Sequence, residues 1–174
     1  ATNYNITVSF IIEGQVDRKA LGLAYENLLK RHEILRTVFI EVQGEPRQKI
    51  LEAVQSGLVI LEENDLLSPS AVKPYVEAFM NEAFTLDSAP PIKSNLVVFQ
   101  QGKSLFNLSL HHIIADGEST KIIINELADL YMQRPDHIPA DSHVEVSYKD
   151  FAVWERNTIG LGGHPSSKQY WMDV

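Results

Sequence analysis

Two adjacent histidines and an aspartate four residues after them are the side chains of this sequence best suited to chemistry. His111 and His112 end a strand-like run, and three apolar residues lead on to Asp116 and Gly117. Because histidine titrates near neutral pH, it can accept or relay a proton and can hold a substrate by a hydrogen bond. The pattern indicates a base or positioning group; the plain structural alternative is a core histidine followed by a helix N-cap at Asp116.

Alternation along the strand assigns the two histidines to opposite faces. Phe106, Leu108 and Leu110 share one parity, so a strand that stays regular to its end carries His112 to this apolar, inward side and His111 to the other. Adjacent strand residues cannot easily share one ion, and the remaining histidines lack ligand spacing. The sequence, which has no cysteine, therefore predicts no metal site.

The composition is that of a globular domain. The 174 residues are 44% hydrophobic and 22% charged, with a formal net charge of −8. The acidic balance argues against a surface that follows nucleic-acid phosphates, and no apolar run reaches the roughly 20 residues of a membrane-spanning helix. With the absence of cysteine, these features predict a soluble cytoplasmic protein that binds neither nucleic acid nor membrane.

Strand and helix patterns mix along the chain without strict alternation. β-Branched and aromatic residues predict strands at 4–12, 37–42, 48–51, 58–61, 92–99 and 105–111, with turns at 44–46 and 101–102. Apolar residues at helical spacing predict helices that begin near residues 17, 69 (or 72), 117, 146 and 166, with prolines at 135 and 139 stopping the third. This order predicts an α+β fold, a mixed β-sheet covered by helices.

Both ends of the chain are abrupt. The first strand pattern begins within four residues, and the last helical pattern stops at two aromatic residues, Tyr170 and Trp171, without a terminating signal. We therefore expect residues 1–174 to be part of a longer protein.

Four stretches, in order, make the chain resemble the condensation domains of nonribosomal peptide synthetases. They are RHEILRTVF at 31–39, FTLDSAPP at 84–91, HHIIADG at 111–117 and YKDFAVW at 148–154. These stretches are similar to the family's RHExLRTxF, FDLxxxPL, HHxxxDG and YxDYAxW motifs. The resemblance implies a domain of two similar halves, each like chloramphenicol acetyltransferase, around a tunnel. Residues 1–174 resemble the N-terminal half, with the C-terminal subdomain absent.

The resemblance implies acyl transfer from a donor thioester on one carrier protein to the amine of an aminoacyl group on another. His112 is then the catalytic residue, which positions the amine and relays a proton. His111, Asp116, Gly117 and Arg36 are the structural part of the motif. His111 packs at the tunnel wall, Asp116 pairs with Arg36 or with an arginine of the missing half, and Gly117 allows a tight turn or close approach of the pantetheine arm.

The same resemblance defines the expected partners and their alternatives. Substrates arrive on the 4′-phosphopantetheine of carrier proteins, and no cofactor is bound directly. The partners are donor and acceptor peptidyl carrier proteins, the missing C-terminal subdomain and neighbouring synthetase domains. Two alternatives stay open, half of an epimerisation domain and a non-catalytic excised or docking subdomain. Glu118 and Lys93 depart from the tryptophan and arginine frequent at these positions, and the isolated chain is expected to be inactive.

Overall fold

The computed structural model describes residues 2–52, 57–133, 146–159 and 165–173. The chain divides into two units, Ala1–Ser142 and His143–Val174, and each is described by itself. Among the described residues, none of the helices combines the length and apolarity needed to cross a bilayer. The predicted stop of the third helix at Pro135 and Pro139 lies outside the described residues.

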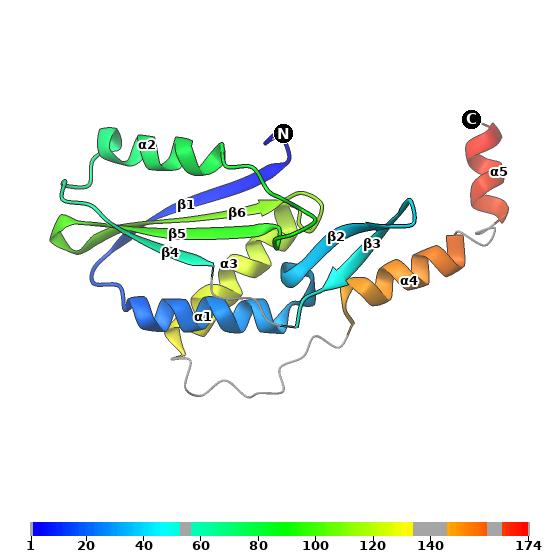
Figure 1. Ribbon diagram of the computed structural model, residues 1–174, viewed down its shortest axis with the longest axis horizontal. Coiled ribbons are helices and arrows are strands. Elements are labelled where there is room, and N and C mark those ends of the chain that lie inside the picture. The colour runs from blue at the N-terminus through cyan, green and yellow to red at the C-terminus, as the bar shows by residue number, and fades with distance from the viewer. Residues whose placement is uncertain (1, 53–56, 134–145, 160–164, 174) are drawn as a thin grey trace. The chain divides into compact units, whose positions relative to one another are not determined.

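A four-stranded sheet forms the centre of the first unit. Its strands are β1 (Asn5–Glu13), β6 (Lys103–His111), β5 (Ile92–Phe99) and β4 (Leu58–Glu62), in that spatial order. β6 is antiparallel to both of its neighbours, whereas β4 runs parallel to β5 (Figure 1). This arrangement confirms the predicted mixed sheet and four of the predicted strands.

A separate hairpin joins β2 (Thr37–Val42) to β3 (Glu45–Ile50). Its turn consists of Gln43 and Gly44, whose φ angles are 56° and 80°. Two consecutive residues with positive φ form the tight turn that suits the twist of a hairpin. The predicted turn at 44–46 is therefore too late in the chain, by one residue at its start and two at its end, because β3 already begins at Glu45. The predicted turn at 101–102 is confirmed.

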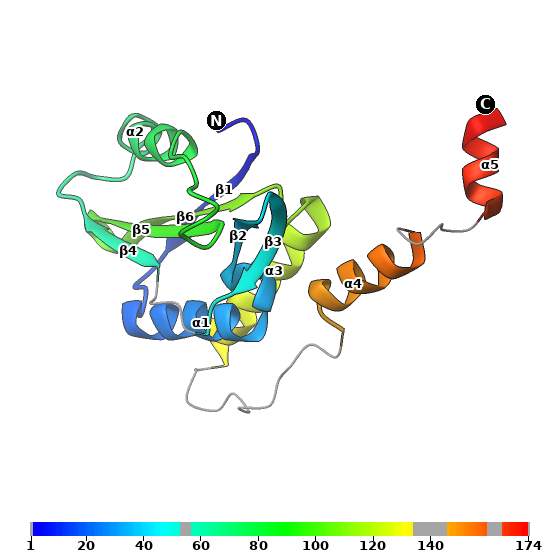
Figure 2. The same cartoon turned by 45° about the vertical axis from the view of Figure 1, so that its right-hand side comes forward.

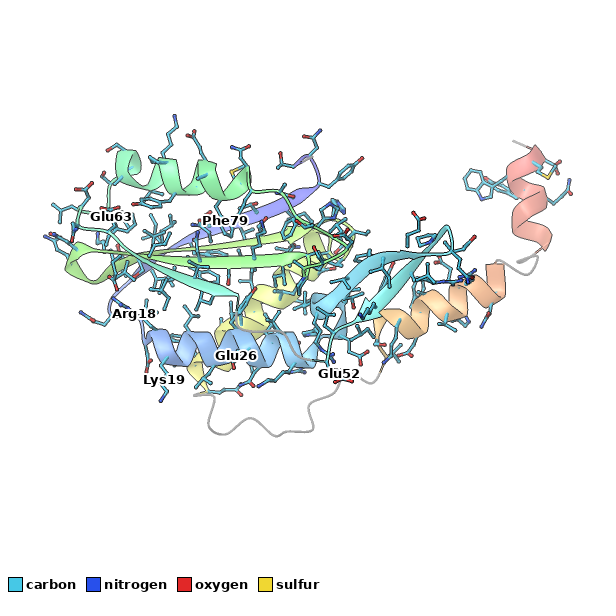
Figure 3. All side chains as sticks on the ribbon, in the orientation of Figure 1. Arg18, Lys19, Glu26, Glu52, Glu63 and Phe79 are labelled. Atoms are coloured by element: carbon cyan, nitrogen blue, oxygen red, sulfur yellow. The ribbon has the colours of Figure 1, made fainter. Side chains whose placement is uncertain are left out.

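Helices cover both faces of the sheet (Figures 1 and 2). α1 (Arg18–Arg31) and α3 (Gly117–Met132) pack on one face, where buried residues of both helices join Leu96 and Leu108 in one apolar cluster. α2 (Pro69–Met80) covers the other face, over a cluster of Val97, Phe99 and Leu105. Phe79 of α2, 7% exposed, lies between the helix and the sheet (Figure 3). The face of the sheet toward α1 and α3 is apolar, whereas the other face combines the apolar cluster with buried polar side chains, among them Asn107 and Ser109, which hydrogen-bond to side chains of neighbouring strands.

Local capping fixes where these helices begin. Asp17 accepts a hydrogen bond from the Ala20 amide at 3.0 Å and caps α1, as predicted. Ser68 caps α2 through the Ala71 amide at 3.2 Å, with Pro69 in the first turn. α2 therefore begins at 69 rather than at 72, and it contains Pro74 within its length.

The second unit contains α4 (Tyr148–Ile159) and α5 (Pro165–Asp173). Each begins within two residues of a predicted helix. The Asp150 carboxylate accepts bonds from the amide and hydroxyl of Ser147 at 2.9 and 2.6 Å, and these bonds lower the Asp150 pKa. Tyr148, Phe151 and Trp154 form a row of rings along α4, with centroids 6.1 and 5.8 Å apart. The YKDFAVW stretch thus supplies a cap and an aromatic stripe.

Candidate functional site

The HHIIADG stretch connects the end of β6 to the start of α3, at one end of the sheet (Figure 1). β6 ends at His111, which pairs with Asn5 as the last register position of β1 and β6. Asp116 is the N-cap of α3. The residues between them form a turn closed by the Ile114 amide, which donates to the His111 carbonyl at 3.0 Å. The sheet and the helix thus fix both ends of the motif.

His112 is exposed at the surface of this chain. The prediction that alternation would carry it to the buried side of the sheet is wrong, because the strand ends one residue earlier. The His112 amide instead donates to the Tyr4 carbonyl at 2.8 Å, beyond the last strand register pair. An exposed imidazole on a turn held at both ends is open to a group supplied by another molecule. Its catalytic role stays a prediction.

His111, the last residue of β6, is half-buried. Its ring lies 5.9 Å from the Phe84 ring, edge to face, and 6.1 Å from the Tyr4 ring, centroid to centroid. Its Nδ1 accepts a hydrogen bond from the Ile113 amide at 3.1 Å. Partial burial, and to a lesser extent the neighbouring His112 side chain, lower the pKa of His111.

Asp116 acts as a local cap in this structure. Its Oδ1 accepts from the amide and the hydroxyl of Ser119 at 2.8 and 2.6 Å, and these bonds lower the pKa of its carboxyl. Within the described part of the chain, Asp116 has no ion pair. Arg36 instead lies 3.7 Å from the Glu33 carboxylate and donates to the Leu51 carbonyl at 2.5 Å. The prediction that Arg36 pairs with Asp116 is therefore wrong. Pairing of Asp116 with an arginine of the C-terminal subdomain stays a prediction.

The predicted tight turn at Gly117 is also not what the backbone shows. Gly117 begins α3 without a positive φ, and, apart from its chain neighbours and the backbone of its own helical turn, no described atom lies within 4 Å of the position that a Cβ would take. Nothing in the described residues therefore requires glycine here. The space beside the backbone is open, which leaves the close approach of another molecule as the remaining prediction.

The RHEILRTVF stretch joins α1 to α3. His32 Nε2 lies 2.5 Å from the Glu126 carboxylate of α3, and Arg31 Nε lies 3.8 Å from it. This contact holds α3, which begins at Gly117 of the HHIIADG stretch, against α1, which precedes the β2–β3 hairpin. The sequence reasoning missed Glu126 and the two rings around His111. Phe84 could have been found, because it opens a recognised motif, whereas Glu126 carries no local signal.

The described residues include no group of three or more histidine, cysteine, aspartate or glutamate side chains that could hold a metal ion. The polar groups at the motif are the imidazoles of His111 and His112, the Asp116 carboxylate and the backbone amides and carbonyls of the turn. Such a set can position and deprotonate a nucleophile.

Replacing Asp116 by alanine should lower the melting temperature of the chain by roughly 2–4 °C, because α3 loses its N-cap. Asp116→Asn is the matched control, since asparagine caps a helix about as well and removes only the charge. Thermal unfolding followed by circular dichroism measures both. An alanine variant with unchanged stability but no activity in the complete domain would favour a catalytic carboxylate instead.

Comparison with known proteins identifies the class to which this site belongs. The condensation domain model matches residues 1–174, the whole length of the chain. The chain belongs to the condensation domain family. The resemblance found in the four motifs is thereby confirmed.

Relatives of known sequence are peptide synthetases. The chain is 38% identical over 173 residues to tyrocidine synthase 3 of Brevibacillus parabrevis, and the aligned region covers 99% of the chain and 2% of the synthase. It is 34% identical over 172 residues to surfactin synthase subunit 2 of Bacillus subtilis (strain 168), and the aligned region covers 99% of the chain and 4% of the subunit. The chain thus spans only a few per cent of the length of these relatives.

Solved structures confirm the fold. The condensation domain of the monacolin K polyketide synthase MokA matches with a TM-score of 0.82 and 21% identity, over 99% of this chain and 38% of that one. The X-domain from teicoplanin biosynthesis, in complex with OxyB, matches with a TM-score of 0.81 and 23% identity, over 91% of this chain and 34% of that one. The α+β, chloramphenicol acetyltransferase-like fold is therefore as predicted.

Proposed function

We propose that residues 1–174 are the N-terminal half of a condensation domain that forms a peptide bond between two carrier-bound groups. The observation that carries this proposal is the exposed His112, held on the turn between β6 and α3 in a chain that the condensation domain model matches throughout. The 38% share of the MokA condensation domain that the chain covers supports its assignment to one half.

The chemistry asked of His112 is modest. A free α-amine has a pKa of roughly 8, so a useful minority is neutral and nucleophilic at pH 7. The amine nitrogen attacks the thioester carbonyl carbon, an N–C bond forms and the C–S bond breaks. His112 holds the amine in place and relays its proton to the departing thiolate sulfur. Because the thioester is already activated, positioning contributes more than base strength.

The other motif residues hold the site in shape. His111 and Asp116 fix the two ends of the turn, and Arg36 braces the hairpin at Leu51. The open space beside Gly117 suits the pantetheine arm that carries the substrate. The partners are donor and acceptor carrier proteins, neighbouring synthetase domains and the C-terminal subdomain. The protein itself binds no cofactor directly.

The test is an assay of the complete domain with both carrier proteins loaded. We expect a dipeptidyl thioester on the acceptor carrier, detected by mass spectrometry. An epimerisation domain would invert a stereocentre on one carrier without needing an acceptor amine, and a docking domain would do neither. Omitting the acceptor amine is the control that separates the three. Inversion without peptide formation would replace the proposal by its epimerisation alternative.

A further inference from the structure

The turn that carries His112 has a partner for each of its four consecutive backbone amides, at positions 111–114. Three of them donate to main-chain carbonyl oxygens, those of Pro91, Tyr4 and His111, at 3.0, 2.8 and 3.0 Å. The fourth, the Ile113 amide, donates to a side chain, the Nδ1 of His111 at 3.1 Å. One side-chain acceptor therefore completes a turn otherwise held by the backbone.

This bond requires one form of the His111 ring. Nδ1 accepts a hydrogen bond only when it carries no proton, so the ring proton sits on Nε2. A protonated ring has two donors and no acceptor, and it would leave the Ile113 amide without this partner. The partial burial that lowers the His111 pKa favours the neutral ring that the bond needs.

The surroundings also restrict the orientation of the ring. The His111 ring contacts the rings of both Tyr4 and Phe84. Phe84 is itself held, because the Lys93 ammonium lies 5.0 Å over its ring and donates to the neighbouring Ala83 carbonyl at 2.8 Å. The aromatic contacts thus limit rotation of the imidazole and keep Nδ1 directed at the turn.

We infer that His111 is a positioning residue for His112, acting through the hydrogen bond from the Ile113 amide to its Nδ1. The inference rests on the proposed function, in which His112 is the group that acts on the amine. The two peptide units that flank His112 are each anchored: the 111–112 peptide by the bond from the His112 amide to the Tyr4 carbonyl, and the 112–113 peptide by the bond from the Ile113 amide to the His111 ring. Loss of the ring acceptor frees this peptide to rotate, and a displacement of about 1 Å at a reacting group can cost on the order of 100-fold in rate.

Two substitutions separate this acceptor from the packing of the ring. In His111→Asn, the asparagine Oδ1 is attached to Cγ, as Nδ1 is in histidine. The variant therefore keeps an acceptor in the same position but loses most of the ring. In His111→Phe, the ring stays against Tyr4 and Phe84 while the acceptor is lost. In the complete domain, we expect kcat to fall roughly 10- to 100-fold for the phenylalanine variant, with KM for the loaded carriers unchanged. The asparagine variant should keep most of the parental rate.

A measurement on the unaltered 174-residue chain tests the geometry without any variant or any activity. Nitrogen-15 NMR of the imidazole should show an unprotonated Nδ1 and a protonated Nε2 for His111, and the Ile113 amide should exchange slowly with solvent. A proton on Nδ1 would overturn the inference, even if both variants failed to fold.

The activity measurements on the variants also distinguish a failure of this inference from a failure of the proposed function. A phenylalanine variant at the parental rate, with an impaired asparagine variant, would show that His111 acts by packing alone. If His112→Ala is inactive in the same assay, only the inference on His111 is lost. Parental activity of His112→Ala would instead remove the proposed function itself.

Discussion

Replacing His112 by alanine in the complete domain should lower the rate of peptide formation by about 10²- to 10⁴-fold, the usual contribution of a positioned acid or base. The fold should be unaffected, because the His112 side chain is exposed and its anchoring bond to the Tyr4 carbonyl comes from the backbone amide. A single-turnover assay that follows the dipeptidyl thioester by mass spectrometry measures the effect, and thermal unfolding checks the fold.

A second substitution tests how His112 acts. In His112→Gln, the side-chain amide reaches about as far as Nε2, so it can hold an amine by a hydrogen bond but cannot take up its proton. If positioning contributes most, this variant should keep more activity than the alanine variant. Ile122→Ala, at an exposed site on α3, is the matched control and should behave as the parent. Alanine at 112 with turnover within a few-fold of the parent would contradict the assigned role.

Periodicity predicted the sheet well and the site residue badly, for the same physical reason. Leu108 and Leu110 alternate with polar residues and are fully buried, because pairing with β1 and β5 keeps β6 regular along this length. Alternation ceases to apply where pairing stops. The end of the strand at His111 depends on carbonyl groups of Tyr4 and Pro91, which no local pattern specifies.

The same distinction separates the caps from the ion pairs. The Asp116 cap uses the amide of Ser119, three residues away, so the spacing in the sequence was enough to predict the helix-cap role of Asp116. The surroundings of Arg36 depend on the β2–β3 hairpin, whose folding brings the Leu51 carbonyl to its guanidinium. A family resemblance suggested a partner for Asp116 that the described residues do not supply. Local hydrogen bonds can be predicted from spacing, whereas contacts across elements require the fold.

Residues 1–174 alone should form no dipeptide at a measurable rate, even though they carry His112. The proposed mechanism depends on holding an amine and a thioester together, and such positioning contributes roughly 7–11 kcal/mol in favourable cases. In the first unit His112 is exposed, and the apolar side chain of Ile113 beside it is 41% exposed. A surface of this kind provides one wall for the substrates, while the proposal places the second wall in the C-terminal subdomain.

The decisive experiment mixes the 174-residue chain with two loaded carrier proteins and follows the product by mass spectrometry. The complete domain is the positive control, and the chain supplemented with a separately produced C-terminal subdomain shows whether activity returns when both walls are present. We expect product from the complete domain and none from the chain alone. Because the described residues of the first unit form their own sheet, helices and apolar core, absence of product together with a native circular dichroism spectrum would not reflect unfolding. Peptide formation by the chain alone at the parental rate, abolished by His112→Ala, would show that one half is a sufficient catalyst and that a tunnel between two halves is not required.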